Sequence, residues 1–298
     1  MGRKLILVFT LLCICHSTFY NTSFANTITD TKNSPQPYQL PNTQVRELTS
    51  KTNGVTYSLY ISLPKGFQKG SDYPVVFTLD ADYSFALAHN IIEHFSERRN
   101  LPKMVVVGIG YPGKGQDGAA YRLNRTRDYT PTHVADGGYG PRFQKHSGGA
   151  RKFAGFIQNE LLPMIQRQYG AGLDDRTIVG HSFGGLFASY VLLTRPRLFQ
   201  RYIIISPSLW YDGKKLFDLQ KRHAKRNNTL KARVFYAVGS EENRTGQPMV
   251  DQLTAFYEAL KQSQYKGLSL TKRIFKDENH NSIFPTALTT GLRTVFAQ

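Results

Sequence analysis

The sequence predicts one α/β domain with a mostly parallel sheet covered by helices on both faces. Short runs of β-branched and apolar residues alternate along the chain with longer segments that repeat apolar residues at helical spacing. Hydrophobic residues make up 40% of the 298 residues and aromatic residues 12%, which is enough to build a large core. No internal repeat or second domain is evident.

Three strands and one helix are predicted in the first half of the domain. The stretch "VTYSLYISLP" at 55–64 alternates apolar and polar residues, as a strand does. The runs "YPVVFTLD" at 73–80 and "MVVVGIGY" at 104–111 are apolar enough to be buried strands. Between them, "FALAHNIIEHFSE" at 85–97 has helical spacing.

The segment 111–150 follows neither period. It is rich in glycine, and loops this long in compact domains are usually functional or disordered. Because the segment also contains aromatic residues and prolines, we expect an ordered loop over a sheet edge. Arg125 and Arg127 lie in this segment, within "RLNRTRDYTP". We predict that they bind an acidic substrate; the alternative is that they pin the loop through ion pairs, for instance with Asp128.

The second half repeats the strand–helix alternation. Residues 153–170 read as a helix ended by Gly170, and 177–180 as a short strand before a second helix. Further strands are predicted at 201–208, 232–240 and 268–276, with helices between and after them.

The N-terminus resembles a secretory signal peptide, predicted to span residues 1–25. Arg3 and Lys4 precede the apolar run "LILVFTLLCIC", and a small residue, Ala25, ends the segment. We therefore expect an exported, periplasmic or secreted protein with no stable membrane anchor after cleavage; the alternative is an uncleaved anchor. A polar, proline-containing arm is predicted at 26–45 and the catalytic domain at 46–298.

Charge and cysteine content narrow the function classes. Cys13 and Cys15 both lie in the predicted signal peptide, so we expect no disulfide and no cysteine nucleophile in the mature chain. The formal net charge of +17 favours acidic small-molecule partners or anionic surfaces. Nucleic acid is not an expected partner, because the chain has no basic tail or nucleic-acid motif. We expect no cofactor and no metal; the oligomeric state is left open.

The stretch "TIVGHSFGGLFASYVLL" carries the chemistry. Its "GHSFG" matches G-x-S-x-G, with Ser182 between Gly180 and Gly184, after a predicted strand and before a predicted helix. In that context the pattern is the nucleophile elbow of α/β-hydrolases, and Ser182 is the candidate nucleophile.

A serine nucleophile needs a base, and the order of this fold is serine, acid, histidine. His280 follows the last predicted strand, where the base belongs, whereas His223 lies on a basic amphipathic helix whose face we expect to be solvated. The acid should follow the strand at 232–240. Glu242 is preferred there, and Glu241 remains an alternative.

Two backbone N–H groups are predicted to stabilise the oxyanion. One belongs to Phe183, directly after the nucleophile, and the other to Asp82 or Ala81, in the turn after "TLD". Trp210 is a candidate stacking wall for the substrate, and packing is the alternative.

Stretches in order over residues 45–298 resemble one known group. They include "YPVVFTLDADYSF", "RTRDYTP", "GHSFGGLFASYVLL", "SPSLWYD" and "ENHNSIFPTALTTGLR". The resemblance is to the bacterial "putative esterase" group of α/β-hydrolases, and within it to periplasmic trilactone-siderophore (enterochelin) esterases. It implies the α/β-hydrolase fold, Ser182 as nucleophile, His280 as base, and oxyanion donors near Asp82 and Phe183. Some members of the siderophore branch use a Ser–His pair alone, which leaves the role of Glu242 open.

The expected activity is serine carboxylester hydrolysis through an acyl-enzyme, on siderophore-like or other anionic small-molecule esters. An acyltransferase would use the same acyl-enzyme, and a non-catalytic relative would bind an acidic ligand.

Overall fold

A computed structural model describes most of the chain from residue 37 onward: residues 37–98, 100–113, 118–171, 174–243 and 246–297. From Gln39 onward the chain is one compact unit. The predicted signal peptide and most of the predicted arm lie outside the described residues. Among the described helices, none has the length and apolarity that crossing a membrane requires.

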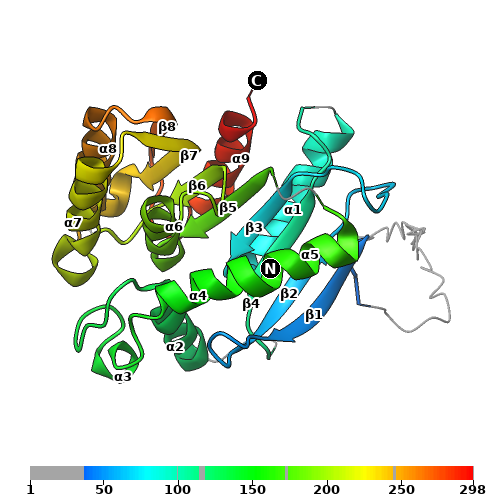
Figure 1. The fold of residues 1–298 in the computed structure, drawn as a ribbon, viewed down its shortest axis with the longest axis horizontal. Helices are drawn as coiled ribbons and strands as arrows, with labels where there is room; N and C mark the ends of the chain where they lie inside the picture. The colour runs from blue at the N-terminus through cyan, green and yellow to red at the C-terminus, as the bar shows by residue number, and fades with distance from the viewer. Residues whose placement is uncertain (1–36, 99, 114–117, 172–173, 244–245, 298) are drawn as a thin grey trace, which may run out of the picture. The chain divides into compact units, whose positions relative to one another are not determined.

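The described residues form an eight-stranded sheet in the order β1-β2-β4-β3-β5-β6-β7-β8 (Figure 1). The β1–β2 and β2–β4 pairs are antiparallel, and all other neighbours are parallel. This confirms the predicted fold class. The strands are β1 Thr43–Thr49, β2 Thr56–Ser62, β3 Val75–Leu79, β4 Val105–Gly110, β5 Arg176–His181, β6 Arg201–Ile205, β7 Thr229–Gly239 and β8 Lys266–Phe275.

Helices bury both faces of the sheet. Along β5, Ile178 belongs to the core under α6, whereas Val179 belongs to the core under α1 and α9, because successive strand residues point to opposite faces. The helices are α1 Ala81–Glu97, α2 Gly118–Tyr129, α3 Pro141–Gln144, α4 Ala150–Phe156, α5 Leu162–Tyr169, α6 Phe183–Thr194, α7 Tyr211–Arg226, α8 Met249–Gln262 and α9 Phe284–Val295. A π-helical turn, η1 (Ile157–Leu161), joins α4 to α5, and the predicted stop at Gly170 has φ 62°.

The expectation of a loop throughout 111–150 is wrong, because this segment contains α2 and the short α3. The buried side chains of α2 are Arg125, Thr126, Asp128 and Tyr129. Its inward face is therefore largely polar and held by ion pairs and hydrogen bonds, so no apolar helical period marks it in the sequence.

The edge strand β1 is a second element that was not predicted. It begins at Thr43, inside the segment assigned to the polar arm, and its side chains are mostly exposed. An edge strand that buries little carries no clear apolar alternation, which is why its pattern resembles a polar arm.

Candidate active site

The carboxyl ends of the parallel strands meet at a cavity of about 420 Å³. Ser182 follows β5 and His280 follows β8, and both line this cavity although 98 positions separate them. Ligands of open α/β sheets bind at this end of the strands. The remaining lining residues are Tyr83, Leu87, Tyr121, Arg125, Tyr139, His181, Asn281, Phe284 and Pro285.

Ser182 lies at a strained turn between β5 and α6. Its φ of 59° and ψ of −117° fall in a region that L-residues rarely adopt, at a cost of about 1–3 kcal/mol. The turn is held by its backbone: the N–H of Ser182 donates to the carbonyl of Ile205 at 3.0 Å, and the N–H of Leu186 donates to the carbonyl of Ser182 at 2.9 Å. This is the strand–turn–helix setting expected of a nucleophile elbow.

The two glycines of the G-x-S-x-G pattern are not equally constrained. A Cβ at Gly180 would overlap the carbonyl oxygen of Gly184, whereas a Cβ at Gly184 would have its nearest neighbours, atoms of Asp80 and Leu79, at 3.5 Å. The next glycine is tighter, since a Cβ at Gly185 would lie 2.9 Å from the carbonyl oxygen of Ile205. Close backbone packing therefore requires glycine at 180 and 185 more than at 184.

Glu242 and His280 form a hydrogen-bonded pair. His280 Nδ1 lies 2.6 Å from Glu242 Oε2, and the side chain of Glu242 is fully buried whereas that of His280 is 33% exposed. The other carboxylate oxygen, Oε1, accepts from the Ser206 hydroxyl at 2.5 Å and from the Gly239 N–H at 2.7 Å. A carboxylate held in this way fixes the orientation of the imidazole and leaves its Nε2 for proton transfer.

The other acid and histidine considered from the sequence lie differently. Glu241 occupies the same 3₁₀ turn as Glu242, η2 (Ser240–Asn243), and its N–H donates to the carbonyl of Glu278 at 3.1 Å. His223 is on α7, where its Nδ1 lies 2.8 Å from the Tyr265 hydroxyl. The structure thus brings Glu242 onto His280.

His181, which sequence analysis did not single out, packs against His280 with the two rings tilted by 37°. The two ring centroids are 4.5 Å apart, and His181 Nδ1 lies 3.4 Å from the Tyr83 hydroxyl. Burial, together with the nearby charges of His280 and Arg125, lowers the pKa of His181 well below its usual value. His181 is therefore a neutral ring at neutral pH, packed against the candidate base.

Two helix N-termini meet near Ser182. Phe183 is the first residue of α6, and Ala81 and Asp82 are the first residues of α1. The N–H groups of a first helical turn have no hydrogen-bond acceptor within their own helix. The side chain of Asp82 is exposed, and the Phe183 ring packs on Tyr139. The predicted oxyanion donors thus come from turns that carry the positive ends of two helix dipoles.

Arg125 lines the cavity but is paired with a carboxylate. Its Nε lies 2.9 Å from Asp80 Oδ1, and both side chains are almost fully buried. Asp80 is thus the partner that neutralises the charge of this arginine in the cavity.

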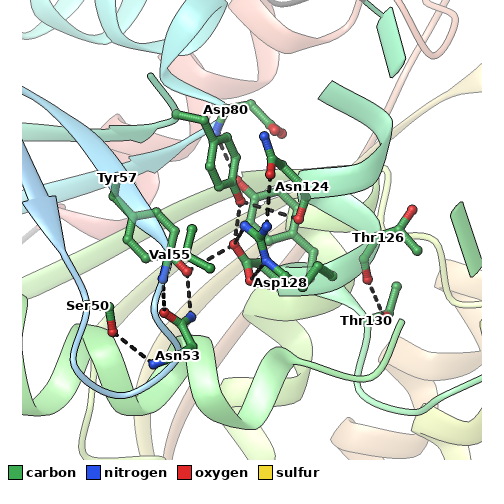
Figure 2. A network of polar contacts seen from close by, with 12 residues as sticks. Ser50, Asn53, Val55, Tyr57, Asp80, Asn124, Thr126, Asp128 and Thr130 are labelled. Carbon is green, nitrogen blue, oxygen red and sulfur yellow. Dashed lines mark hydrogen bonds and ion pairs between the residues drawn. The ribbon is translucent and has the colours of Figure 1, made fainter. Parts of the chain in front are cut away.

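Arg127 donates to both carboxylate oxygens of its neighbour Asp128 and is not among the cavity-lining residues. Asp128 also accepts from the hydroxyls of Tyr57 and Tyr111 at 3.0 and 2.8 Å, in a network that continues through Asn53 (Figure 2). The arrangement is that of the alternative reading, in which Arg127 pins its segment by an ion pair.

Trp210 also lies outside the lining of the cavity. Its ring packs beside Phe183, with centroids 5.8 Å apart, and beside Tyr211. This contact corresponds to packing, the alternative to a stacking wall for substrate.

Aromatic side chains that sequence analysis missed make up much of the cavity wall. Tyr121 and Tyr139 come from the segment without periodicity, and Tyr83 and Phe284 come from the first turns of α1 and α9. For Tyr83 and Phe284, the one sequence signal of a place in the site is that each lies in the first turn of a helix that comes after a strand. Within the described ranges, no group of three or more His, Cys, Asp or Glu side chains has the arrangement of a metal site.

Comparisons with known proteins give one matching family and several similar structures. The model of the family described as "Putative esterase" matches residues 50–295. The ferri-bacillibactin esterase BesA of Bacillus subtilis is 33% identical over 268 residues, covering 86% of this chain and 90% of the relative. The crystal structure of the BES protein from Bacillus cereus has a TM-score of 0.77 at 30% identity, covering 90% of this chain and all of that one. An IroE-like serine hydrolase from Shewanella oneidensis has a TM-score of 0.76 at 31% identity, covering 85% and 80%.

Proposed function

Since the chain belongs to the "Putative esterase" family and is a serine esterase, we propose that it hydrolyses siderophore-like esters outside the cytoplasm through an acyl-enzyme on Ser182. The observation that carries the catalytic assignment is the 2.6 Å contact of Glu242 with His280, on the cavity that Ser182 also lines.

In this mechanism Ser182 Oγ attacks the ester carbonyl carbon while His280 Nε2 takes its proton. The negative charge that develops on the carbonyl oxygen is stabilised by the N–H groups of Phe183 and Asp82. His280 then returns the proton to the leaving alkoxide, and the acyl-enzyme remains. Water, deprotonated by His280, attacks the acyl carbon. The bond from that carbon to Ser182 Oγ then breaks as His280 gives the proton to Oγ, which releases the acid and free Ser182. Glu242 holds the imidazole and stabilises its protonated form.

The substrate is an ester with an aromatic, catecholate-type acyl portion. Four rings line the cavity, those of Tyr83, Tyr121, Tyr139 and Phe284, and flat aromatic groups pack well against such walls. Two relatives, a ferri-bacillibactin esterase and a siderophore triacetylfusarinine C esterase of Aspergillus fumigatus, support siderophore-like esters as substrates. Export rests on the signal-peptide pattern of residues 1–25.

Replacing Glu242 with glutamine should lower kcat about 10²- to 10⁴-fold, because an amide cannot stabilise the protonated imidazole and favours the wrong tautomer. Glu241→Gln is the matched control: it makes the same chemical change one residue away, in the same turn, and should retain kcat within about threefold. Steady-state kinetics on a p-nitrophenyl ester measure both. Equal activity of the two variants would indicate a Ser–His pair without an acid.

A panel of p-nitrophenyl esters tests the substrate class. The benzoate and dihydroxybenzoate esters should have kcat/KM about fivefold above the hexanoate and succinate esters, since ring packing of this kind contributes about 1 kcal/mol. The preference should change little between low and high salt, because Asp80 neutralises Arg125. A salt-sensitive preference for the succinate ester would instead support an anionic substrate attracted by positive charge. A preference for the hexanoate ester would contradict the proposal that the acyl portion is aromatic. Acyl transfer to an added alcohol, in place of acid release, would identify an acyltransferase.

A further inference from the structure

We infer that Arg125 is a positioning residue of the oxyanion hole: its guanidinium fixes the turn after β3 and the nucleophile elbow relative to each other. The inference rests on the proposed function, because it concerns the same reaction at Ser182. It replaces the expectation that Arg125 binds an anionic substrate.

The guanidinium of Arg125 contacts both turns at once. Its Nε and Nη2 donate to the two carboxylate oxygens of Asp80 at 2.9 and 3.2 Å, and Nη2 also donates to the carbonyl of His181 at 3.1 Å. Asp80 is the N-cap of α1, and His181 directly precedes Ser182. One rigid planar group thus joins the two turns whose N–H groups, at Asp82 and Phe183, are the predicted oxyanion donors.

Both joined turns are held in conformations that need support. Asp80 has φ 56° and Ser182 has φ 59°, in the half of backbone space that L-residues seldom occupy. Such conformations persist only where surrounding contacts over-determine them. The N–H of Asp80 also donates to the Tyr129 hydroxyl at 3.3 Å, so the turn is fixed from its backbone as well as from its carboxylate.

Arg125 has little freedom to take part in substrate binding. Its side chain is 3% exposed, its Nη1 donates to the Tyr139 hydroxyl, and its guanidinium lies over the rings of Tyr121 and Phe183 at 5.0 and 5.7 Å. Burial raises the pKa of Asp80, and Arg125 opposes that shift. Without Arg125 the pKa of Asp80 would rise further, and the hydrogen bonds that hold the turn would be lost.

The test compares Arg125→Met and Arg125→Lys with Arg127→Met. Arg127 is the matched control, because it lies two residues away on α2 and is paired with a carboxylate, Asp128, but is not among the residues that line the cavity. Lysine keeps the charge of Arg125 but, as a point charge, cannot bridge Asp80 and the His181 carbonyl with the geometry of the fork. The variant Asp80→Asn/Arg125→Met removes both charges, so no buried carboxylate is left alone if Arg125→Met fails to fold.

Arg125→Met and the double variant should lower kcat about 10²-fold or more, the size of a lost oxyanion donor, with KM changed less than about threefold. The kcat of Arg125→Lys should lie between that of these two variants and that of the wild type. Binding of a trifluoromethyl ketone transition-state analogue should weaken in proportion to kcat/KM. Arg127→Met should keep kcat within about threefold, even where its melting temperature falls.

A raised KM with unchanged kcat would assign Arg125 to substrate binding and overturn the inference. Equal kcat losses in folded Arg125→Met and Arg127→Met, checked by circular dichroism, would also overturn it, since the effect would then be general destabilisation. Failure of the proposed function is recognised separately, because it would leave Ser182→Ala active, whereas failure of this inference alone leaves Ser182→Ala inactive.

Discussion

Ser182→Ala is expected to reduce ester hydrolysis by about 10⁴- to 10⁶-fold while the protein stays folded, as removal of the nucleophile of a serine hydrolase does. Alanine keeps the Cβ of serine and loses its hydroxyl group, and the backbone hydrogen bonds of the elbow do not involve that hydroxyl. Steady-state rates on p-nitrophenyl butyrate, with circular dichroism as the folding check, measure the effect.

The matched control for this variant is Ser208→Ala. The Ser208 hydroxyl lies 3.4 Å from that of Ser182, so it is the neighbouring group that could be mistaken for the nucleophile. Ser208→Ala should retain activity within about tenfold and still be labelled by a fluorophosphonate, whereas Ser182→Ala should not be labelled. Labelling and turnover of Ser182→Ala at wild-type levels would refute the nucleophile assignment.

His280→Ala is expected to be nearly as inactive as Ser182→Ala, since without a base the serine hydroxyl is a poor nucleophile. The two residues act as one unit, so the double variant should be little slower than either single variant. A matched control is His223→Ala, which removes a half-buried histidine on α7 that bonds to Tyr265.

The decisive measurement is the comparison of the four rates: wild type, two single variants and the double variant. Losses that multiply in the double variant would show that Ser182 and His280 do not work together. His223→Ala should keep kcat, with any cost confined to stability. A kcat loss in His223→Ala as large as that in His280→Ala would contradict the assignment of His280 as the base.

Elements whose burial is apolar were predictable from the chain alone. The strands β3 and β4 are buried throughout, and β5 is buried between its two end residues; each contains a run of β-branched or other apolar residues. The elbow was equally readable, because its demands are local: a strand, a glycine that leaves room for a backbone, a serine and a helix. The position of His280 followed from the order of the strands, since the base of this fold follows the last one.

Polar burial could not be read in the same way. The segment of α2 has no apolar stripe, because Arg125 and Asp128 face inward and are stabilised by partners on other elements. Arg125 therefore looked like a loop cation that would attract anions, whereas its partner Asp80 lies 45 positions earlier. The periodicity of a segment reports the spacing of its apolar residues, and it contains no information about an ion pair with a residue distant in the sequence.

The sequence by itself determined the fold class, the buried strands in their order along the chain, and the positions of the elbow and of His280. These features depend on local periodicity, on the order of elements along the chain and on backbone packing between near neighbours. The tertiary structure decided which glutamate reaches His280, which rings line the cavity, and what Arg125 holds. Glu241 and Glu242 are chemically identical neighbours, and the direction of each side chain depends on the turn after β7 and on the contact made from Ser206. The contacts that make the choices for Glu242 and Arg125 join residues 36 to 56 positions apart, and they exist only once the sheet has brought the strand ends together.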